Sequence, residues 1–392
     1  MATTSMTCPV RSFAWENLCV SSTTQEAPPP QSLPTETLEL IFDLTVAESR
    51  RDLNPNNAPL ILRKVNRRWR AIADGRKNLW SHLTIQPSQF HQANAAVASQ
   101  WLKRAGATTM LQITLVAHGV HRRHIRRVLD AILHTSIQWE CLYLDVPASS
   151  AKYVLNNPAV AFPALKQLRL EIDGHVVLKP HAPLLDAVRL LIRPPTWQPM
   201  TIMNLGWASI TYLDIDIASG TLDYIWHVMY LCPHLDTLRV TAFINCMLPQ
   251  RPVLLHHHIY SNIRKLRLVC DLRPSVVAHF LYGLTLPRLN YLELICFDDS
   301  PESFEWPMKA ITDLRQRCLP PLVSLVTVGK RISEADIIAL VRNLKYLEEI
   351  AVVHENQDLV TDAVRALLPR DNAALEKQHA AYYQERAMAG LP

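Results

Sequence analysis

A short leucine-rich segment recurs through most of the 392-residue sequence and limits what the chain can fold into. Its copies have the form L-x-x-L-x-L with apolar replacements, and they begin at Trp139, Leu165, Leu185, Ile210, Leu235, Ile263, Leu289, Leu322 and Leu347. Successive starts are 26, 20, 25, 25, 28, 26, 33 and 25 residues apart. A near-constant period of this length is typical of stacked units that bury their apolar faces on one another.

Several segments between the copies have the apolar spacing of a helix. In residues 122–133, apolar side chains recur at i, i+3, i+4, i+7 and i+8, and a capping box at Ser333 and Asp336 starts another such stripe. Strand, return and strand at this period predict a leucine-rich-repeat solenoid over residues 108–370. We expect a horseshoe with a parallel inner sheet and an outer helical face, an α/β fold.

The N-terminal part of the chain has a different pattern. Residues 1–31 are rich in Ser, Thr and Pro and are predicted to be a flexible tail. Residues 32–84 then contain short amphipathic stretches with two tryptophans, Trp69 and Trp80. Three short helices cannot make a large independent core, so such a unit usually needs a partner to bury its apolar face.

The order of motifs in residues 33–83 resembles the F-box. These motifs are LPTE at 33–36, IF at 41–42, VNRRWR at 65–70 and LW at 79–80, with Asn66 where a cysteine is more usual. Families of this type occur widely in filamentous fungi, often with a long loop after the first helix, as at about residues 45–57. The resemblance implies a three-helix F-box at 32–84, a connecting segment at 85–107 before the solenoid, and a C-terminal cap or tail at 371–392.

The resemblance also implies a function. An F-box binds the small adaptor of SCF-type cullin-RING ubiquitin ligases, and through it a cullin, so the chain would be the substrate-recognition subunit whose solenoid holds a protein target. The implied adaptor-binding positions are Leu33, Pro34, Leu38, Ile41, Phe42, Leu62, Val65, Trp69, Leu79 and Trp80. One alternative is a ligase-independent scaffold, and another is that these residues only form the core of a helical cap on the solenoid.

The middle residue of each L-x-L should point away from the core onto the concave face, because side chains alternate along a strand. The candidate target-binding positions are therefore Tyr143, Arg169, Arg189, Asp214, Arg239, Arg267 and Glu293, with Ala351 in the last copy. Four arginines in a ladder about 5 Å apart would favour an acidic or phosphorylated target. The alternative is a merely solvated strand face.

Other features exclude several classes of function. Forty basic and 35 acidic residues leave a net charge of only +5, so nucleic acid is not expected as a partner. The basic run at 121–127 falls on a predicted amphipathic helix and is interpreted as its solvated face. With nine glycines there is no phosphate-binding loop, and familiar catalytic signatures are absent, so we expect neither enzymatic activity nor a cofactor.

Metal and membrane binding are not indicated either. The eight cysteines include no C-x-x-C pair, and the three histidines at 256–258 would point to alternate sides of an extended chain, so no metal site is expected. The sequence has neither a secretory leader nor a run of 18 apolar residues, so membrane association is not expected. We expect a cytoplasmic or nuclear protein with reduced cysteines.

Overall fold

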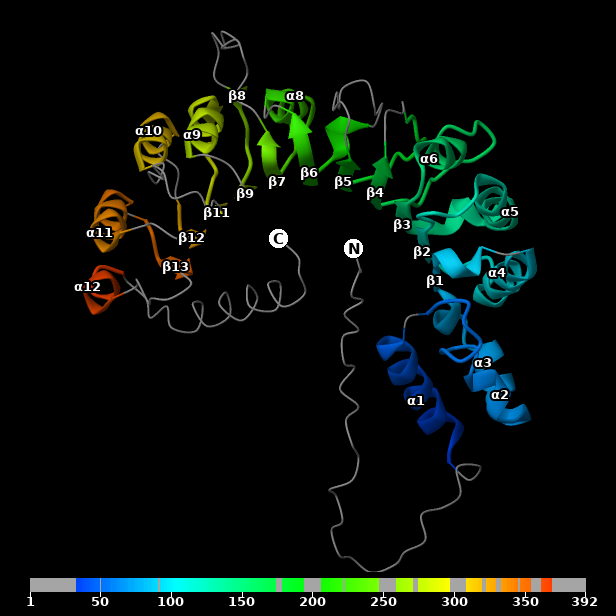
Figure 1. Cartoon of the computed structure of the whole chain (residues 1–392). Helices are drawn as coiled ribbons and strands as arrows, with labels where there is room; N and C mark the ends of the chain where they lie inside the picture. The colour runs from blue at the N-terminus through cyan, green and yellow to red at the C-terminus, as the bar shows by residue number, and fades with distance from the viewer. Residues whose placement is uncertain are drawn as a thin grey trace, which may run out of the picture.

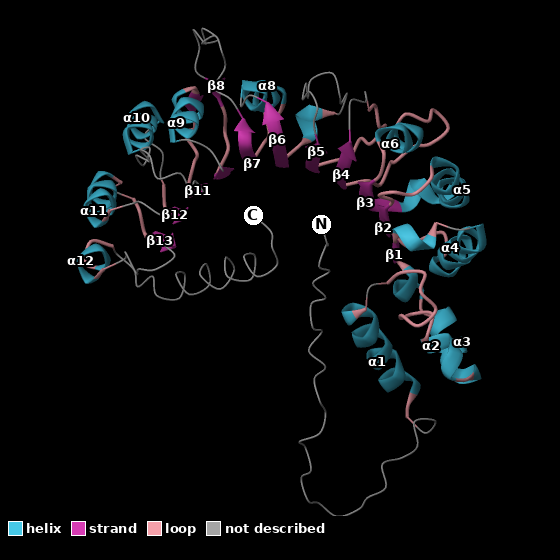
Figure 2. Ribbon diagram, viewed as in Figure 1, coloured by secondary structure: helices cyan, strands magenta, loops and turns pink. Residues whose placement is uncertain are grey.

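The structure is a computed structural model that describes residues 33–49, 51–90, 92–173, 178–193, 206–220, 223–246, 259–270, 274–296, 308–318, 322–328, 333–344, 346–353 and 361–368. The described elements form a curved solenoid with its strands on the inner, concave side and its helices outside, and a small helical unit stands at the N-terminal end (Figure 1). Figure 2 shows the same separation of helices and strands around the arc.

The inner layer is one parallel sheet of eleven strands in the order β1-β2-β3-β4-β5-β6-β7-β9-β11-β12-β13. The strands are β1 (His82–Ile85), β2 (Leu111–Val116), β3 (Trp139–Asp145), β4 (Gln167–Asp173), β5 (Ala187–Arg193), β6 (Tyr212–Gly220), β7 (Thr237–Cys246), β9 (Lys265–Cys270), β11 (Tyr291–Cys296), β12 (Ser324–Val328) and β13 (Glu349–Val353). A separate parallel pair joins β8 (Ile259–Tyr260) to β10 (Leu284–Thr285).

The outer layer contains α4 (Gln92–Ala105), α5 (Arg122–Ile132), α6 (Ala148–Leu155), α8 (Asp223–Leu231), α9 (Pro274–Tyr282), α10 (Met308–Cys318), α11 (Glu334–Asn343) and α12 (Asp362–Arg365). The predicted capping box is present at α11, where the side chains of Ser333 and Asp336 each accept from the other residue's backbone N–H. The apolar stripe of α5 is buried as its spacing predicts. The α/β repeat fold expected from the sequence is thus confirmed.

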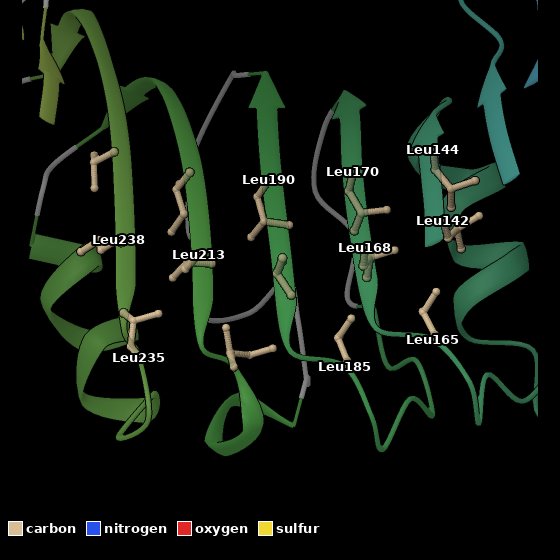
Figure 3. Close-up of a cluster of buried hydrophobic side chains, with 14 of the residues drawn as sticks. Leu142, Leu144, Leu165, Leu168, Leu170, Leu185, Leu190, Leu213, Leu235 and Leu238 are labelled. Atoms are coloured by element: carbon tan, nitrogen blue, oxygen red, sulfur yellow. The ribbon is translucent and has the colours of Figure 1, made fainter. Parts of the chain in front are cut away.

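The leucines of the repeat form the core between the two layers. Leu165, Leu168 and Leu170 are all buried, and the corresponding leucines of neighbouring copies lie in successive columns on the same side of the sheet (Figure 3). Each copy is also tied to the next through its backbone: the N–H groups of Asp186 and Ala187 both donate to the carbonyl of Lys166 at 3.0 Å. Repeated apolar stacking and a repeated backbone ladder together give the regular arc.

The N-terminal unit consists of α1 (Thr35–Glu48), α2 (Leu62–Val65), α3 (Arg67–Gly75) and the 3₁₀ turn η2 (Lys77–Trp80). Asn66, which departs from the F-box pattern, caps α3: its side chain accepts from the N–H of Trp69 at 2.8 Å. The ring of Trp69 contacts Phe42 of α1 with centroids 5.0 Å apart. Arg76, at the end of α3, pairs with Glu39 and Asp43 and so fixes α1 against α3.

This unit shares its core with the first repeat. Trp80 is fully buried and meets Trp101 of α4 edge to face at 5.0 Å, and the indole N–H of Trp101 donates to the Trp80 carbonyl at 2.9 Å. Asp74 accepts from Arg63 of α2 at 2.7 Å and from Arg104 of α4 at 2.9 Å. The helical unit is therefore joined to the solenoid by packing and by charge.

The solenoid begins earlier than the sequence boundaries predicted. Strand β1, within the range 32–84 assigned to the F-box, pairs in parallel with β2, and the expected connecting segment 85–107 contains α4, which is the return helix of this first repeat. The repeat was missed because HLTI lacks the leucine spacing of the later copies.

The loop between α1 and α2 covers the outer edge of β1. The N–H of Thr84 donates to the carbonyl of Arg51 at 3.0 Å, and Asp52 forms an isolated parallel bridge with Thr84. The Asp52 carboxylate accepts from the Asn54 N–H at 3.0 Å and from the Asn57 amide at 2.8 Å, which organises the loop itself. Residues 51–57 of the predicted long loop are therefore part of the sheet edge.

Within the described ranges, no helix combines the length and the apolar character needed to cross a lipid bilayer. The predicted N-terminal tail at 1–31, the C-terminal cap or tail at 371–392 and the histidines at 256–258 lie outside the described residues.

Candidate functional site

Helix α1 has apolar side chains on two faces. Leu38, Phe42 and Val46 point into the core and are buried. Leu40 and Leu44 face outward and are 61% and 59% exposed, and Ile41 beside them is 36% exposed. One face of α1 thus builds the helical unit, and the other presents large apolar side chains to solvent.

The neighbouring segment at α2 adds two exposed apolar residues, Ile61 at 39% and Val65 at 54%. We call the five side chains together the α1/α2 apolar surface: Leu40, Ile41, Leu44, Ile61 and Val65. Thirteen large apolar residues are exposed among the described residues, and these five fall within 26 positions of the chain. The exposed apolar side chains are therefore concentrated in the N-terminal helical unit.

The structure divides the ten predicted adaptor-binding residues into three groups. Pro34, Ile41 and Val65 are exposed and Leu33 and Trp69 are half-buried. The remaining five are corrections, because they are core residues of the helical unit or of its junction with the solenoid: Leu38, Phe42, Leu62, Leu79 and Trp80. Burial inside the unit removes their side chains from the surface that a partner could touch.

Leu40, Leu44 and Ile61 were missed by sequence reasoning. The spacing i, i+4 of Leu40 and Leu44 repeats that of Leu38 and Phe42 with a two-residue offset, which places the two pairs on different faces of one helix. A second apolar stripe on a short amphipathic helix was therefore the available signal.

Basic side chains flank the α1/α2 apolar surface. Residues 63–70 contain five basic and no acidic residues, and Lys64, Arg67 and Arg70 are exposed. Arg68 is partly buried and donates to the carbonyl of Leu33 at 2.7 Å, which holds the Leu-Pro turn against α3. The helical unit therefore exposes basic side chains as well as apolar ones.

The predicted target-binding residues form one row across the concave sheet. Strand register aligns Tyr143, Arg169, Arg189, Asp214, Arg239, Arg267 and Glu293 in succession. Val326 of β12 and Ala351 of β13 continue the row. The alternation rule therefore found the right face and the right neighbours.

In the structure, each arginine of the expected ladder already has an acidic partner. Arg189 lies 3.3 Å from Asp214, and Arg239 lies 3.6 Å from the same carboxylate. Arg267 lies 3.2 Å from Glu293. The charges of this row are largely compensated within the sheet, so the row by itself gives no reason to expect an acidic or phosphorylated target.

A second row of carboxylates was missed by sequence reasoning. Asp145, Glu171 and Asp216 each lie two residues beyond a row position, on the same concave side, and all three are buried. Glu171 accepts from Arg169 at 2.6 Å, and Arg169 also stacks on the Tyr143 ring at 4.3 Å. The period-2 pattern that gave the first row extends to these positions, so the signal was in the sequence.

Burial raises the pKa of Tyr143 well above its ordinary value, with Glu171 adding to the rise through its charge and through a hydrogen bond. The phenol therefore stays protonated and donates to Glu171. This hydrogen bond gives the concave face an ordered polar cluster at β3 and β4.

The basic run at 121–127 lies on α5 as predicted. Arg122, Arg123, Arg126 and Arg127 are exposed, whereas the apolar residues of the helix are buried against the repeat core. The guanidinium of Arg126 stacks on Tyr153 of α6 at 4.7 Å. A solvated helix face is what the structure shows.

No family model and no curated protein matches the chain. Among solved structures, a protein from Bacteroides fragilis is 14% identical with a TM-score of 0.35, covering 62% of this chain and 76% of its own. A crystal structure of the Rad7 and Elc1 complex in yeast is similar at 12% identity and a TM-score of 0.33, covering 83% of this chain and 90% of that one. Neither likeness is close enough to bear on function.

Proposed function

We propose that the chain is a non-catalytic substrate-recognition subunit of an SCF-type cullin-RING ubiquitin ligase. Its N-terminal helices dock the adaptor, and its concave sheet holds the protein to be modified. The observation that carries the proposal is the α1/α2 apolar surface, which lies on the helical segment whose motifs resemble the F-box.

The energetics of this surface favour docking. Burying one large apolar side chain contributes roughly 1.5–3 kcal/mol, so covering even two or three of the five would make a substantial contribution to an interface. The helices that present them are held rigidly, by Arg76 between α1 and α3 and by Asp74 between α2 and α4. A pre-organised surface loses little side-chain and backbone entropy on binding.

The exposed basic residues near this surface indicate the chemistry of the partner. Because Lys64, Arg67 and Arg70 are exposed beside apolar side chains, the adaptor should present an apolar groove with an acidic rim. Exposed charge pairs of this kind are screened by salt, so association should slow as ionic strength rises while the apolar contacts persist.

The solenoid supplies the other half of the function. Its concave face offers Tyr143 and the paired arginines on a rigid parallel sheet, and a target can exchange partners with these groups without a change of fold. Adaptor and target bound to one chain are held at a high effective concentration, which is how such a subunit promotes ubiquitin transfer without chemistry of its own.

The test uses the full chain with purified adaptor and cullin. The double variant Leu40→Asp/Leu44→Asp places charge on the proposed docking surface. Its matched control is Ile137→Asp/Leu184→Asp, at two solenoid positions that are 59% and 56% exposed. We expect wild type and control to capture adaptor and cullin, and the α1 variant to lose both, with all three equally folded by circular dichroism. Capture by the α1 variant, or loss by both variants, would overturn the docking assignment.

A second measurement separates a ligase subunit from a scaffold. Proteins captured through the solenoid should carry more ubiquitin in cells with the wild-type chain than in cells with the α1 variant. Equal ubiquitin on captured proteins, together with intact adaptor binding by the wild type, would favour the scaffold.

A further inference from the structure

Three side chains that can bind a metal converge at the C-terminal ends of β2, β3 and β4. His118 follows β2 by two residues, Asp145 ends β3, and Glu171 lies in β4. One ligand atom from each, an imidazole nitrogen and two carboxylate oxygens, lie within 4.8 Å of one another. This is the separation at which a single ion can contact all three after small side-chain rotations.

The backbone fixes the three positions. Val116 and Asp145 are register partners, and so are Asp145 and Glu171. Beyond the end of β2, the Ala117 N–H donates to the Asp145 carbonyl at 2.8 Å, and the Val146 N–H donates to the Glu171 carbonyl at 3.2 Å. The side chains are thus presented by three adjacent rungs of one rigid ladder.

Neighbouring side chains hold one of the three ligands, Glu171, in place. Glu171 is oriented by the Tyr143 hydroxyl and by Arg169, whose guanidinium lies 2.6 Å from it. A carboxylate has about four acceptor sites, so it can keep such donors while an oxygen coordinates an ion. Outer-shell donors that orient ligands are a regular feature of metal sites.

Burial and access also fit an ion. Asp145 and Glu171 are 6% and 8% exposed, so two carboxylates lie close together in a largely dehydrated place, which favours a nearby cation. The His118 side chain, in contact with Asp145, is 41% exposed and leaves a route from solvent. Arg169 balances the charge of Glu171, and a divalent ion would balance the remaining carboxylate charge of Asp145.

We propose that His118, Asp145 and Glu171 form a binding site for a first-row divalent transition metal ion, for which Zn²⁺ is the probe. One imidazole and two carboxylates make a mixed nitrogen and oxygen donor set, which suits Zn²⁺ better than Mg²⁺ or Ca²⁺, ions that prefer oxygen alone. Three protein ligands leave a fourth position open.

No local sequence motif points to this site. The ligands are 27 and 26 residues apart, one from each of three consecutive repeats, so they follow the period of the solenoid rather than a local metal motif. Only the stacking of repeats brings them together.

The experiment is isothermal titration of the tag-free full chain with Zn²⁺, comparing wild type with His118→Ala and Glu171→Gln. The matched control is His134→Ala, another exposed histidine of the same part of the solenoid. We expect one Zn²⁺ equivalent on wild type and control, and affinity at least about tenfold lower for the two ligand variants. Mg²⁺ should bind more weakly than Zn²⁺ to every variant.

A spectroscopic readout keeps the result independent of folding differences. Co²⁺ bound at the site should give d–d absorption bands in wild type and His134→Ala, with the bands lost in His118→Ala, whose side chain is accessible enough for the change to leave the fold intact. Equal Zn²⁺ affinity in wild type and both ligand variants, or an equal loss in His134→Ala, would overturn the proposal.

Discussion

In the solenoid, both leucines of an L-x-L pair, such as Leu168 and Leu170, face the same core and are buried between sheet and helices. In α1, apolar residues of similar spacing divide between two faces, so that Leu38 is buried and Leu40 is largely exposed. Residues two apart lie on one face of a strand but on opposite sides of a helix. Each repeat is covered by its neighbours, whereas among the described residues the outer face of α1 remains exposed. The repeats complete their core within the chain, whereas α1 keeps an exposed apolar face, the surface that we propose a partner covers.

The variant with the largest expected effect tests the junction between the helical unit and the solenoid. Trp80→Ala should destabilise the protein by about 3–5 kcal/mol, because it removes a fully buried ring that packs against Trp101. Urea unfolding followed by far-UV circular dichroism measures the loss. Trp69→Ala, at a half-buried ring inside the helical unit, should cost less. If the two variants were equally stable, the helical unit and the solenoid would not share the core described here.

The next pair of variants compares the buried and the exposed face of α1. Leu38→Ala should lose about 2–5 kcal/mol of unfolding free energy, as buried leucines do. Leu40→Ala should change it by no more than about 0.5 kcal/mol, yet should weaken adaptor binding. Thermal unfolding and a binding titration on the same two proteins give both quantities. A large stability loss for Leu40→Ala would mean that the outer face is covered within the chain.

The smallest effect concerns the buried charges of the concave face. Burial raises the pKa of Asp214, although Arg239 and Arg189 oppose the rise. Because the folded protein then holds this proton more tightly than the unfolded chain, the contribution of Asp214 to stability should fall as pH increases from about 3.8 through the raised value, by at most about 1.4 kcal/mol per pH unit.

Asp214→Asn removes this dependence. Unfolding free energies measured at several pH values should show the wild type losing stability relative to the variant as pH rises. The opposite trend would mean that the two arginines, rather than burial, dominate the carboxyl group.

Periodicity predicted the solenoid and the row from Tyr143 to Glu293, because alternation along a strand and stacking of repeats follow from backbone geometry alone. It could not separate the core from the exposed face of α1, since Phe42 and Leu44 are equally apolar and differ only in what packs against them. Pairing of Arg189 with Asp214 depends on which strands are adjacent, and so does the meeting of His118 with Glu171. Such contacts between repeats become visible only when the copies are placed side by side.

The loop at Arg51 and Asp52 protects the outer edge of β1 from pairing with other molecules. A terminal strand of a sheet presents backbone donors and acceptors that can recruit a strand from another molecule. In this protein the Thr84 N–H is already occupied by the Arg51 carbonyl, and Asp52 places a charged residue along the same edge. The long insertion after the first helix therefore works against end-to-end polymerisation of the solenoid through β1.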